Sequence, residues 1–158
     1  MSTPALAPVV RRVVRSDQPR WAELFADYRD FYGLGTDSAA VARTWEWVVG
    51  EQHGLIGLVA VSAESTSELL GLANLRAFAR PSTGTIGLYL DDLFADPSAR
   101  RRGVGAALLD AAADLAAQRG ATVVRWITDG GNVTARALYD QHAAATPWIT
   151  YDMPPAGR

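Results

Sequence analysis

Residues 90–109 read LDDLFADPSARRRGVGAALL and form the most informative segment of this chain. An acidic, apolar strand is followed by a turn, a basic loop with two glycines and a helix rich in alanine and leucine. The first N–H groups of such a helix have no partner within it, and the helix dipole favours an anion beside them. Gly103 and Gly105 allow a ligand to approach the backbone, and three arginines add positive charge. The segment therefore predicts a cradle for a pyrophosphate group.

The composition excludes several classes of function. The chain has 158 residues, which predicts one domain over residues 1–158 with flexible tails at 1–8 and 154–158. A net charge of −2 argues against nucleic acid as a partner. No apolar run reaches the ~20 residues that a membrane span needs. The N-terminal residues do not resemble a signal peptide, so we expect a cytoplasmic protein.

The chain contains neither cysteine nor lysine, because all fifteen basic residues are arginine. Without cysteine there is no cysteine nucleophile, no disulfide and no thiolate ligand, and we expect no metal site. Without lysine there is no Schiff base and no Walker phosphate loop. Arginine in place of lysine, together with abundant alanine, indicates a bacterial genome rich in G and C.

The hydrophobic pattern predicts alternating groups of strands and helices. We expect strands at residues 9–15, 55–63, 69–78, 85–95, 121–128 and 148–153. We expect helices that end near residues 32, 49, 118 and 144, with Asp17 as N-cap of the first and Asp37 or Ser38 at the start of the second. A three-strand meander that leads into a β-α-β crossover predicts an α/β fold, with a mixed sheet and helices on both faces.

The two glycines do not fit the common nucleotide-binding motifs. A dinucleotide motif would need a third glycine where the chain has Leu108, and its glycines would directly follow the strand. What remains is Arg100-x-x-Gly103-x-Gly105 before an apolar helix. This pattern resembles the coenzyme A loop of the GCN5-related N-acetyltransferases, the GNAT family. The alternative is an ordinary helix N-terminus whose glycines serve only a tight turn.

A second motif, Asn132-x-x-Ala135-x-x-Leu138-Tyr139, resembles the C-terminal motif of the same family. On a helix, Asn132, Ala135 and Tyr139 lie near one face. The resemblance places the asparagine at the pantetheine arm of the coenzyme and the tyrosine hydroxyl near its sulfur. The alternative for Tyr139 is a core tyrosine with an exposed hydroxyl.

The two motifs and the elements that flank them cover residues 85–151, and the order of elements extends the resemblance to the whole chain. It implies the GNAT fold, with a mostly antiparallel mixed sheet that splays between its fourth and fifth strands. Residues 30–33, 91–94 and 148–151 resemble the branch that acetylates polyamines, amino acids and other small amines. The family often has Gly-Phe soon after the motif tyrosine, whereas this chain has His142–Ala145. The resemblance therefore does not imply the shape of the C-terminal wall of the acceptor site.

The resemblance implies acetyl-CoA as the cofactor. The pyrophosphate is held by backbone N–H groups of the loop, and the pantetheine arm pairs with a strand edge opened by a bulge and by divergence from residues 122–128. An N–H group of Leu93 or Phe94 polarises the thioester carbonyl. The coenzyme-binding residues expected are Leu93, Phe94, Ala95, Arg100, Arg101, Arg102, Gly103, Val104, Gly105, Ala106, Asn132 and Tyr139.

Acetyl transfer to an amine needs a base, because an alkylammonium with a pKa of about 10.4 is mostly protonated at neutral pH. Asp91 and Asp92 are the candidates, and strand alternation places them on opposite faces, so that only one easily faces the acceptor. The resemblance favours Asp91, with Asp92 as runner-up. The alternative is that both only offset the nearby arginines. Tyr139 is the expected general acid for the leaving thiolate, in a direct transfer without a covalent enzyme intermediate.

Aromatic residues crowd the first two predicted helices. Most of them are expected in the core, and Tyr28, Tyr32 and Trp45 are expected to line the substrate pocket with Asp91. His53 and His142 are isolated and fit turn or surface positions. We therefore predict an N-acetyltransferase for a small-molecule amine, namely a polyamine, an amino acid or an amine-bearing antibiotic, with a homodimer as one option. The alternatives are a protein or peptide N-acetyltransferase and a non-catalytic acyl-CoA-binding module.

Overall fold

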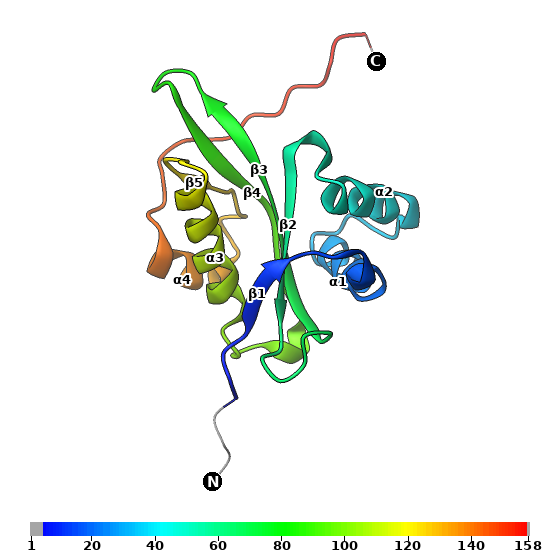
Figure 1. Cartoon of the computed structure of the whole chain (residues 1–158). Helices are drawn as coiled ribbons and strands as arrows, with labels where there is room; N and C mark the ends of the chain where they lie inside the picture. The colour runs from blue at the N-terminus through cyan, green and yellow to red at the C-terminus, as the bar shows by residue number, and fades with distance from the viewer. Residues whose placement is uncertain (1–4, 158) are drawn as a thin grey trace. The chain divides into compact units, whose positions relative to one another are not determined.

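A computed structural model describes residues 5–157 of the chain (Figure 1). The chain divides into two compact units, Met1–Ile127 and Thr128–Arg158. The single domain over residues 1–158 therefore stays a prediction. Of the expected tails, residues 1–4 and 158 lie outside the described residues.

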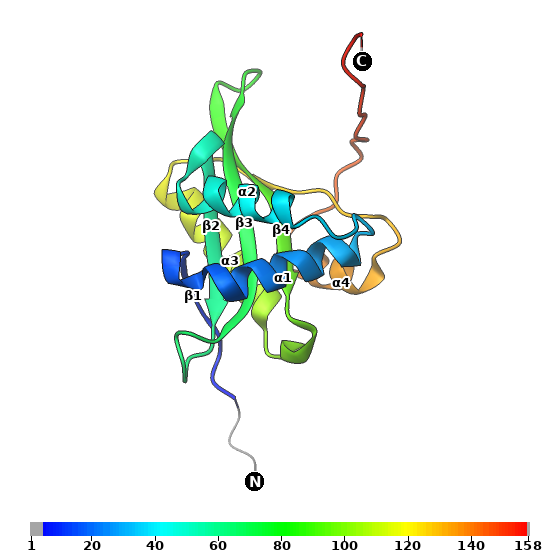
Figure 2. The ribbon, with the colours of Figure 1, turned by 90° about the vertical axis from the view of Figure 1, so that its right-hand side faces the viewer.

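The first unit is a five-stranded mixed sheet with helices on both faces (Figures 1 and 2). The strands lie in sequence order, with β1 to β4 antiparallel and β5 parallel to β4. The strands are β1 (Val9–Arg12), β2 (Leu55–Val61), β3 (Leu69–Arg80), β4 (Thr85–Ala95) and β5 (Val124–Arg125). The helices are α1 (Gln18–Phe31), α2 (Ser38–Val49) and α3 (Val104–Gln118), with short 3-10 turns η1 (Arg15–Asp17), η2 (Gln52–Gly54) and η3 (Pro97–Ala99). The predicted α/β fold with a mixed sheet is confirmed.

The main core lies between the sheet and the pair α1 and α2, which cover one face while α3 covers the other (Figure 2). The ring centroid of Trp21 lies 4.8 Å from that of Phe25 and 5.2 Å from that of Trp45. Trp45 is only 4% exposed, because Val41, Trp45 and Val48 form the apolar face that α2 turns toward the sheet. Trp45, expected in the pocket wall, is therefore a core residue.

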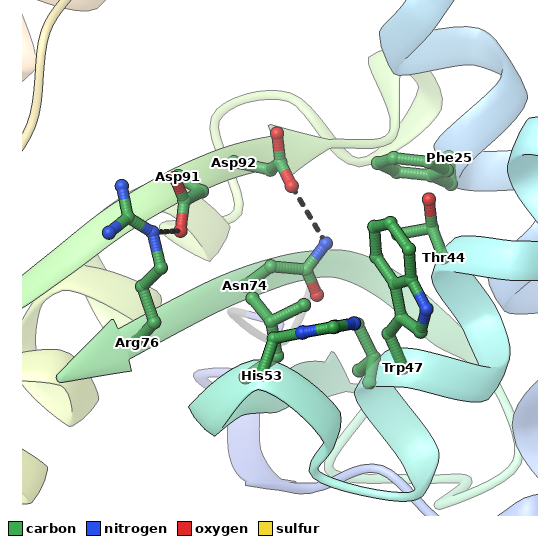
Figure 3. Close-up of a pocket in the computed structure, with 10 residues that line it drawn as sticks. Phe25, Thr44, Trp47, His53, Asn74, Arg76, Asp91 and Asp92 are labelled. Carbon is green, nitrogen blue, oxygen red and sulfur yellow. Dashed lines mark hydrogen bonds and ion pairs between the residues drawn. The ribbon is translucent and has the colours of Figure 1, made fainter.

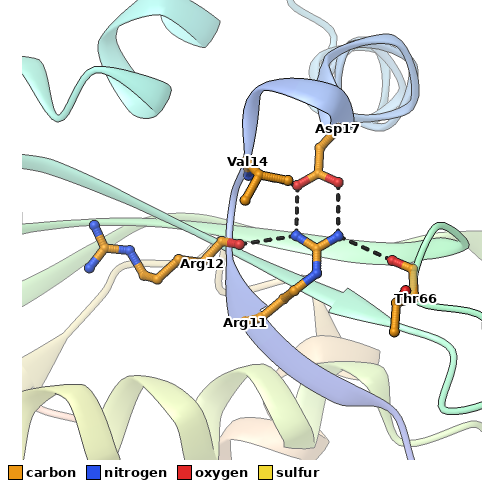
Figure 4. A network of polar contacts seen from close by, with 5 residues as sticks. All are labelled: Arg11, Arg12, Val14, Asp17 and Thr66. Carbon is orange, nitrogen blue, oxygen red and sulfur yellow. Dashed lines mark hydrogen bonds and ion pairs between the residues drawn. The ribbon is translucent and has the colours of Figure 1, made fainter.

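Asp17 ties the start of α1 to the sheet in a network of polar contacts (Figure 4). Asp17 is the N-cap residue of α1, as predicted, but its buried carboxylate makes no capping bond. It accepts hydrogen bonds from Arg11 at 2.8 and 2.9 Å and from the Val14 N–H at 2.8 Å. Arg11 also donates to the carbonyl oxygens of Arg12 and Thr66. Burial alone would raise the pKa of Asp17, but the bonds from Arg11 and Val14 outweigh it and lower that pKa.

The second unit contains one helix, α4 (Val133–His142), within its described residues. Asn132 caps it, since its side-chain oxygen accepts a hydrogen bond from the Ala135 N–H at 3.3 Å. The strand predicted at residues 148–153 is not formed, and Trp148 and Tyr151 there are 83% and 88% exposed. A strand needs a neighbour to pair with, and none of the described strands pairs with this segment.

Candidate active site

Asp91 and Asp92 lie where a bulge interrupts the pairing of β3 with β4. Asn74 is opposite Asp92 and Leu75 is opposite Leu90, so Asp91 is the extra residue. A bulge breaks the strict alternation of side chains between the two faces of a sheet. Both carboxylates consequently line the same cavity, which corrects the expectation that they point to opposite faces (Figure 3). The bulge that the resemblance implies for the fourth strand is present.

The cavity has a volume of about 490 Å³ and lies in the first unit, between the bulge, α2 and η2. Its wall is apolar on one side and carries two aspartates and an arginine on the other. The lining residues are Phe25, Thr44, Trp47, Val48, His53, Leu55, Asn74, Arg76, Asp91 and Asp92. Tyr28 and Tyr32, which were expected here, are not among them, although the Tyr28 hydroxyl lies 3.5 Å from the carbonyl oxygen of Asp91.

The two carboxylates have different partners. Asp91 accepts a hydrogen bond from Nε of Arg76 at 2.9 Å and forms an ion pair with it, while Asp92 accepts one from Nδ2 of Asn74 at 2.9 Å. Burial raises the pKa of Asp91, against the opposing effect of Arg76. Burial also raises the pKa of Asp92, opposed by hydrogen bonds from Asn74 and Tyr28. Within the described part of the chain Asp92 has no ion-pair partner.

Asn74 was missed by the sequence reasoning, although it is the one polar residue in the middle of a buried apolar run, residues 69–75. Its side chain is buried, with the residue only 1% exposed, and its Oδ1 has no hydrogen-bond partner among residues 5–157. His53 occupies a turn, as expected, but its ring also forms part of the cavity wall, 4.9 Å from the ring of Trp47. Neither the pairing of Asn74 with Asp92 nor the approach of His53 has a local sequence signal.

The turn before α3 lies where the sequence predicts the phosphate cradle. Gly103 is the N-cap residue and has a left-handed backbone with φ 75°, and Arg101 has φ 63°. No side chain caps α3, and its first backbone bond runs from the Ala107 N–H to the Gly103 carbonyl at 2.9 Å. The N–H groups of Val104–Ala106 consequently have no acceptor within the helix. Exposed Arg100 and Arg101 stand beside them.

The outer edge of β4 is open where an extended ligand would pair. β5 is shorter than the predicted strand and pairs with β4 only from Val124 to Leu88 and from Arg125 to Tyr89. Beyond these pairs, no strand of the described residues bonds to Leu90–Ala95 on the side away from β3. The predicted splaying between the fourth and fifth strands is therefore confirmed, and the free backbone groups suit strand addition.

Two features are absent from the described residues. None of the helices in residues 5–157 is long and apolar enough to cross a membrane. No cluster of three or more histidine, cysteine, aspartate or glutamate side chains that could hold a metal ion occurs in the same range. Asn132 and Tyr139 belong to the second unit, so the roles expected for them stay predictions.

Comparison with known proteins relates this chain to acetyltransferases. A sequence model of the acetyltransferase (GNAT) family matches residues 21–143. The uncharacterized N-acetyltransferase YhfO of Bacillus subtilis is 36% identical over 134 residues, 84% of this chain and 87% of that protein. The D-amino-acid N-acetyltransferase HPA3 of Saccharomyces cerevisiae is 26% identical over 143 residues, 90% of this chain and 88% of that protein. The crystal structure of a probable acetyltransferase has the same fold, with a TM-score of 0.82 at 22% identity over 95% of this chain and 99% of that one.

Proposed function

The chain belongs to the acetyltransferase (GNAT) family of N-acetyltransferases, and we infer that it moves an acetyl group from acetyl-CoA directly to a primary amine of a small molecule. The observation that carries this proposal is the cavity in which Asp91, Asp92 and Asn74 meet, on the strand whose outer edge is open. The relative named for D-amino acids supports a small amine as acceptor.

The residues around the start of α3 fit coenzyme A. Unpaired N–H groups, a helix dipole and exposed arginines suit its pyrophosphate, and the open edge Leu93–Ala95 suits the amides of its pantetheine arm. A substituted Cβ on Gly103 would meet nothing within 4 Å, so the backbone there is open to a ligand. When bound, acetyl-CoA supplies the acetyl group as a thioester.

Asp92 is our choice for the base that accepts the proton of the ammonium. A base must have its charge available, and the charge of Asp91 is already paired with Arg76. Asp92 has neutral donors only, and burial raises its pKa, which brings it closer to the operating pH. The nitrogen, once neutral, can form the new C–N bond while the sulfur leaves.

Tyr139 is proposed as the acid that returns a proton to the leaving sulfur. The proposal rests on the resemblance of the motif Asn132 to Tyr139 and on the reference pKa of tyrosine near 10. Asn132 already has a structural task as the cap of α4. Its proposed contact with the pantetheine arm would come in addition to that task.

The decisive experiment measures release of free thiol from acetyl-CoA with a panel of amines, peptides and no acceptor. We expect turnover with small primary amines and little with peptides. Tight coenzyme binding without turnover on any acceptor would show a non-catalytic acyl-CoA-binding module. Turnover confined to peptides would show a protein or peptide acetyltransferase, and either result would contradict the proposal.

A further inference from the structure

We propose that the acceptor is a primary amine with a single positive charge and an apolar, aromatic tail, and that Asn74 selects its ammonium group. This inference rests on the proposed function and deepens it by naming the class of substrate. The observation behind it is that Asn74 lines the cavity while its buried Oδ1 has no hydrogen-bond partner in the described chain.

The orientation of the Asn74 amide follows from its neighbour. Nδ2 donates to the Asp92 carboxylate at 2.9 Å, because two oxygens facing each other would repel, and Oδ1 is therefore turned the other way. In Figure 3 this oxygen points toward the side of the cavity where His53 and Trp47 lie. A buried acceptor without a donor is unfavourable, and a ligand N–H removes that penalty. An ammonium group carries three donors, and Asn74 and Asp92 both present acceptors to it.

The charges at the cavity wall match one positive charge. Arg76 and Asp91 neutralise each other as an ion pair, which leaves the carboxylate of Asp92 for the ligand. A polyamine would bring a second ammonium against apolar side chains, where an unpaired charge is costly. An amino acid would bring its carboxylate close to two acids. Arg76, the nearest cation, is held by Asp91 through Nε and stacks 4.8 Å above the ring of Tyr89.

The rest of the wall suits an aromatic tail. Phe25, Trp47, Val48 and Leu55 contribute apolar surface, and the rings of Trp47 and His53 meet edge to face. A volume of about 490 Å³ lies within the range of small-molecule sites and is large enough for one aromatic ring with a short aminoalkyl chain. The apolar half of the cavity would bury the ring while the polar half holds the nitrogen.

The test compares phenylethylamine, spermidine and phenylalanine by kcat/KM with acetyl-CoA. We expect phenylethylamine to exceed both others by at least about tenfold, the factor that corresponds to 1.4 kcal/mol of discrimination. Amine binding is measured separately, by calorimetry on protein saturated with coenzyme A, where no acetyl group is available. Preference for spermidine or phenylalanine would overturn the inference and leave the proposed function intact, whereas no turnover with any amine would overturn the proposed function.

Single substitutions test which residues of the cavity select the amine. Asn74→Ala should weaken phenylethylamine binding by about tenfold, as expected for loss of a hydrogen bond to a charged group, and leave coenzyme affinity unchanged. Trp47→Leu should lower the preference for phenylethylamine over a short alkylamine, while Phe31→Leu, on an exposed residue of the first unit that does not line the cavity, should leave it unchanged. If Asn74→Ala is poorly folded, Trp47→Leu alone decides. Unchanged amine affinity in folded Asn74→Ala would contradict the assignment.

Discussion

Two neighbouring carboxylates in β4 differ because of the residues opposite them. Arg76 neutralises Asp91, whereas Asn74 only donates a hydrogen bond to Asp92. Burial raises the pKa of both acids, but only Asp92 keeps an uncompensated charge for a ligand. The chemical difference between two identical side chains therefore comes from β3 rather than from β4.

Replacing the proposed base tests this division of roles. Asp92→Asn should lower kcat by about 10²–10⁴-fold, the usual contribution of general base catalysis. Asp91→Asn is the matched control, and it should lose less activity because Asp92 remains in place. Thiol release under saturating acetyl-CoA measures both. A larger loss in Asp91→Asn would reverse the two roles.

The raised pKa of Asp92 also makes a prediction about stability. Its pKa in the folded state lies above the ordinary value of 3.8, so the folded state holds its proton longer than the unfolded state. Stability is consequently lost as the pH rises from 3.8 through the folded-state pKa, and this penalty is complete above it. Asp92→Asn should therefore raise Tm at neutral pH, and the gain should disappear in acid. A lower Tm of the variant at neutral pH would contradict the sign.

At the scale of single elements, the start of α3 depends on the backbone of Gly103. A side chain there meets no neighbour, so the effect of a substitution comes from the left-handed φ of 75° and not from a clash. For an L residue this conformation is unfavourable by roughly 1–2 kcal/mol. The turn would relax and move the N–H groups that form the proposed cradle.

Gly103→Val should therefore raise the Kd for coenzyme A by about tenfold, as measured by calorimetry, because 1.4 kcal/mol corresponds to that factor. Gly120 at the other end of α3 has a similar φ of 66° and also an open surrounding, so Gly120→Val is the matched control. Both variants should lose similar stability. Equal coenzyme affinity in the two variants would show that the cradle lies elsewhere.

The Arg11–Asp17 network connects β1 with the start of α1. The pKa of its carboxylate is shifted in the opposite direction from that of Asp92. The pKa of Asp17 is lowered, so its stabilisation is complete above the ordinary value of 3.8 and is lost as the pH falls through the folded-state pKa. Asp17→Asn should lower the free energy of unfolding by about 2 kcal/mol at neutral pH, since one hydrogen bond to a charged group contributes roughly 1.5–3 kcal/mol.

Urea unfolding of Asp17→Asn at neutral and acidic pH measures this effect, and the difference from the wild type should shrink in acid. Asp37→Asn is the control, because Asp37 caps α2 through one bond to the Ala40 N–H and asparagine caps a helix equally well. A constant difference at every pH would exclude the charge of Asp17 as the cause.

At the scale of the whole molecule, the residue proposed as the acid, Tyr139, belongs to the second unit. Tyr139→Phe should lower kcat by about 10²-fold, the lower end of acid catalysis, and leave the Kd for coenzyme A nearly unchanged, because only a hydroxyl is removed. Rapid-mixing kinetics and calorimetry separate the two quantities. An unchanged kcat would remove Tyr139 as the acid.

Most elements of the fold were predictable from local patterns. The ranges of α2 and β4 match the prediction, because each has a strong periodic pattern and clear ends. The prediction of a last strand was wrong, because residues 148–153 have the composition of a strand but no strand beside them in the described chain. β5 is shorter than the strand predicted at residues 121–128, because β4 pairs with only two residues of that segment.

The sequence alone indicates the loop proposed to bind the coenzyme, the two acids of β4 and the order of the elements, because each of these depends on neighbours within a few residues. The cavity proposed for the acceptor could not be predicted from neighbours along the sequence. Asn74 meets Asp92 only through the register of β3 against β4, and the bulge at Asp91 turns both acids to one face. Trp47, rather than Trp45, reaches the cavity because the packing of α2 settles which of its faces is buried. Long-range pairing therefore determined the site, since residues that are distant along the chain provide its walls.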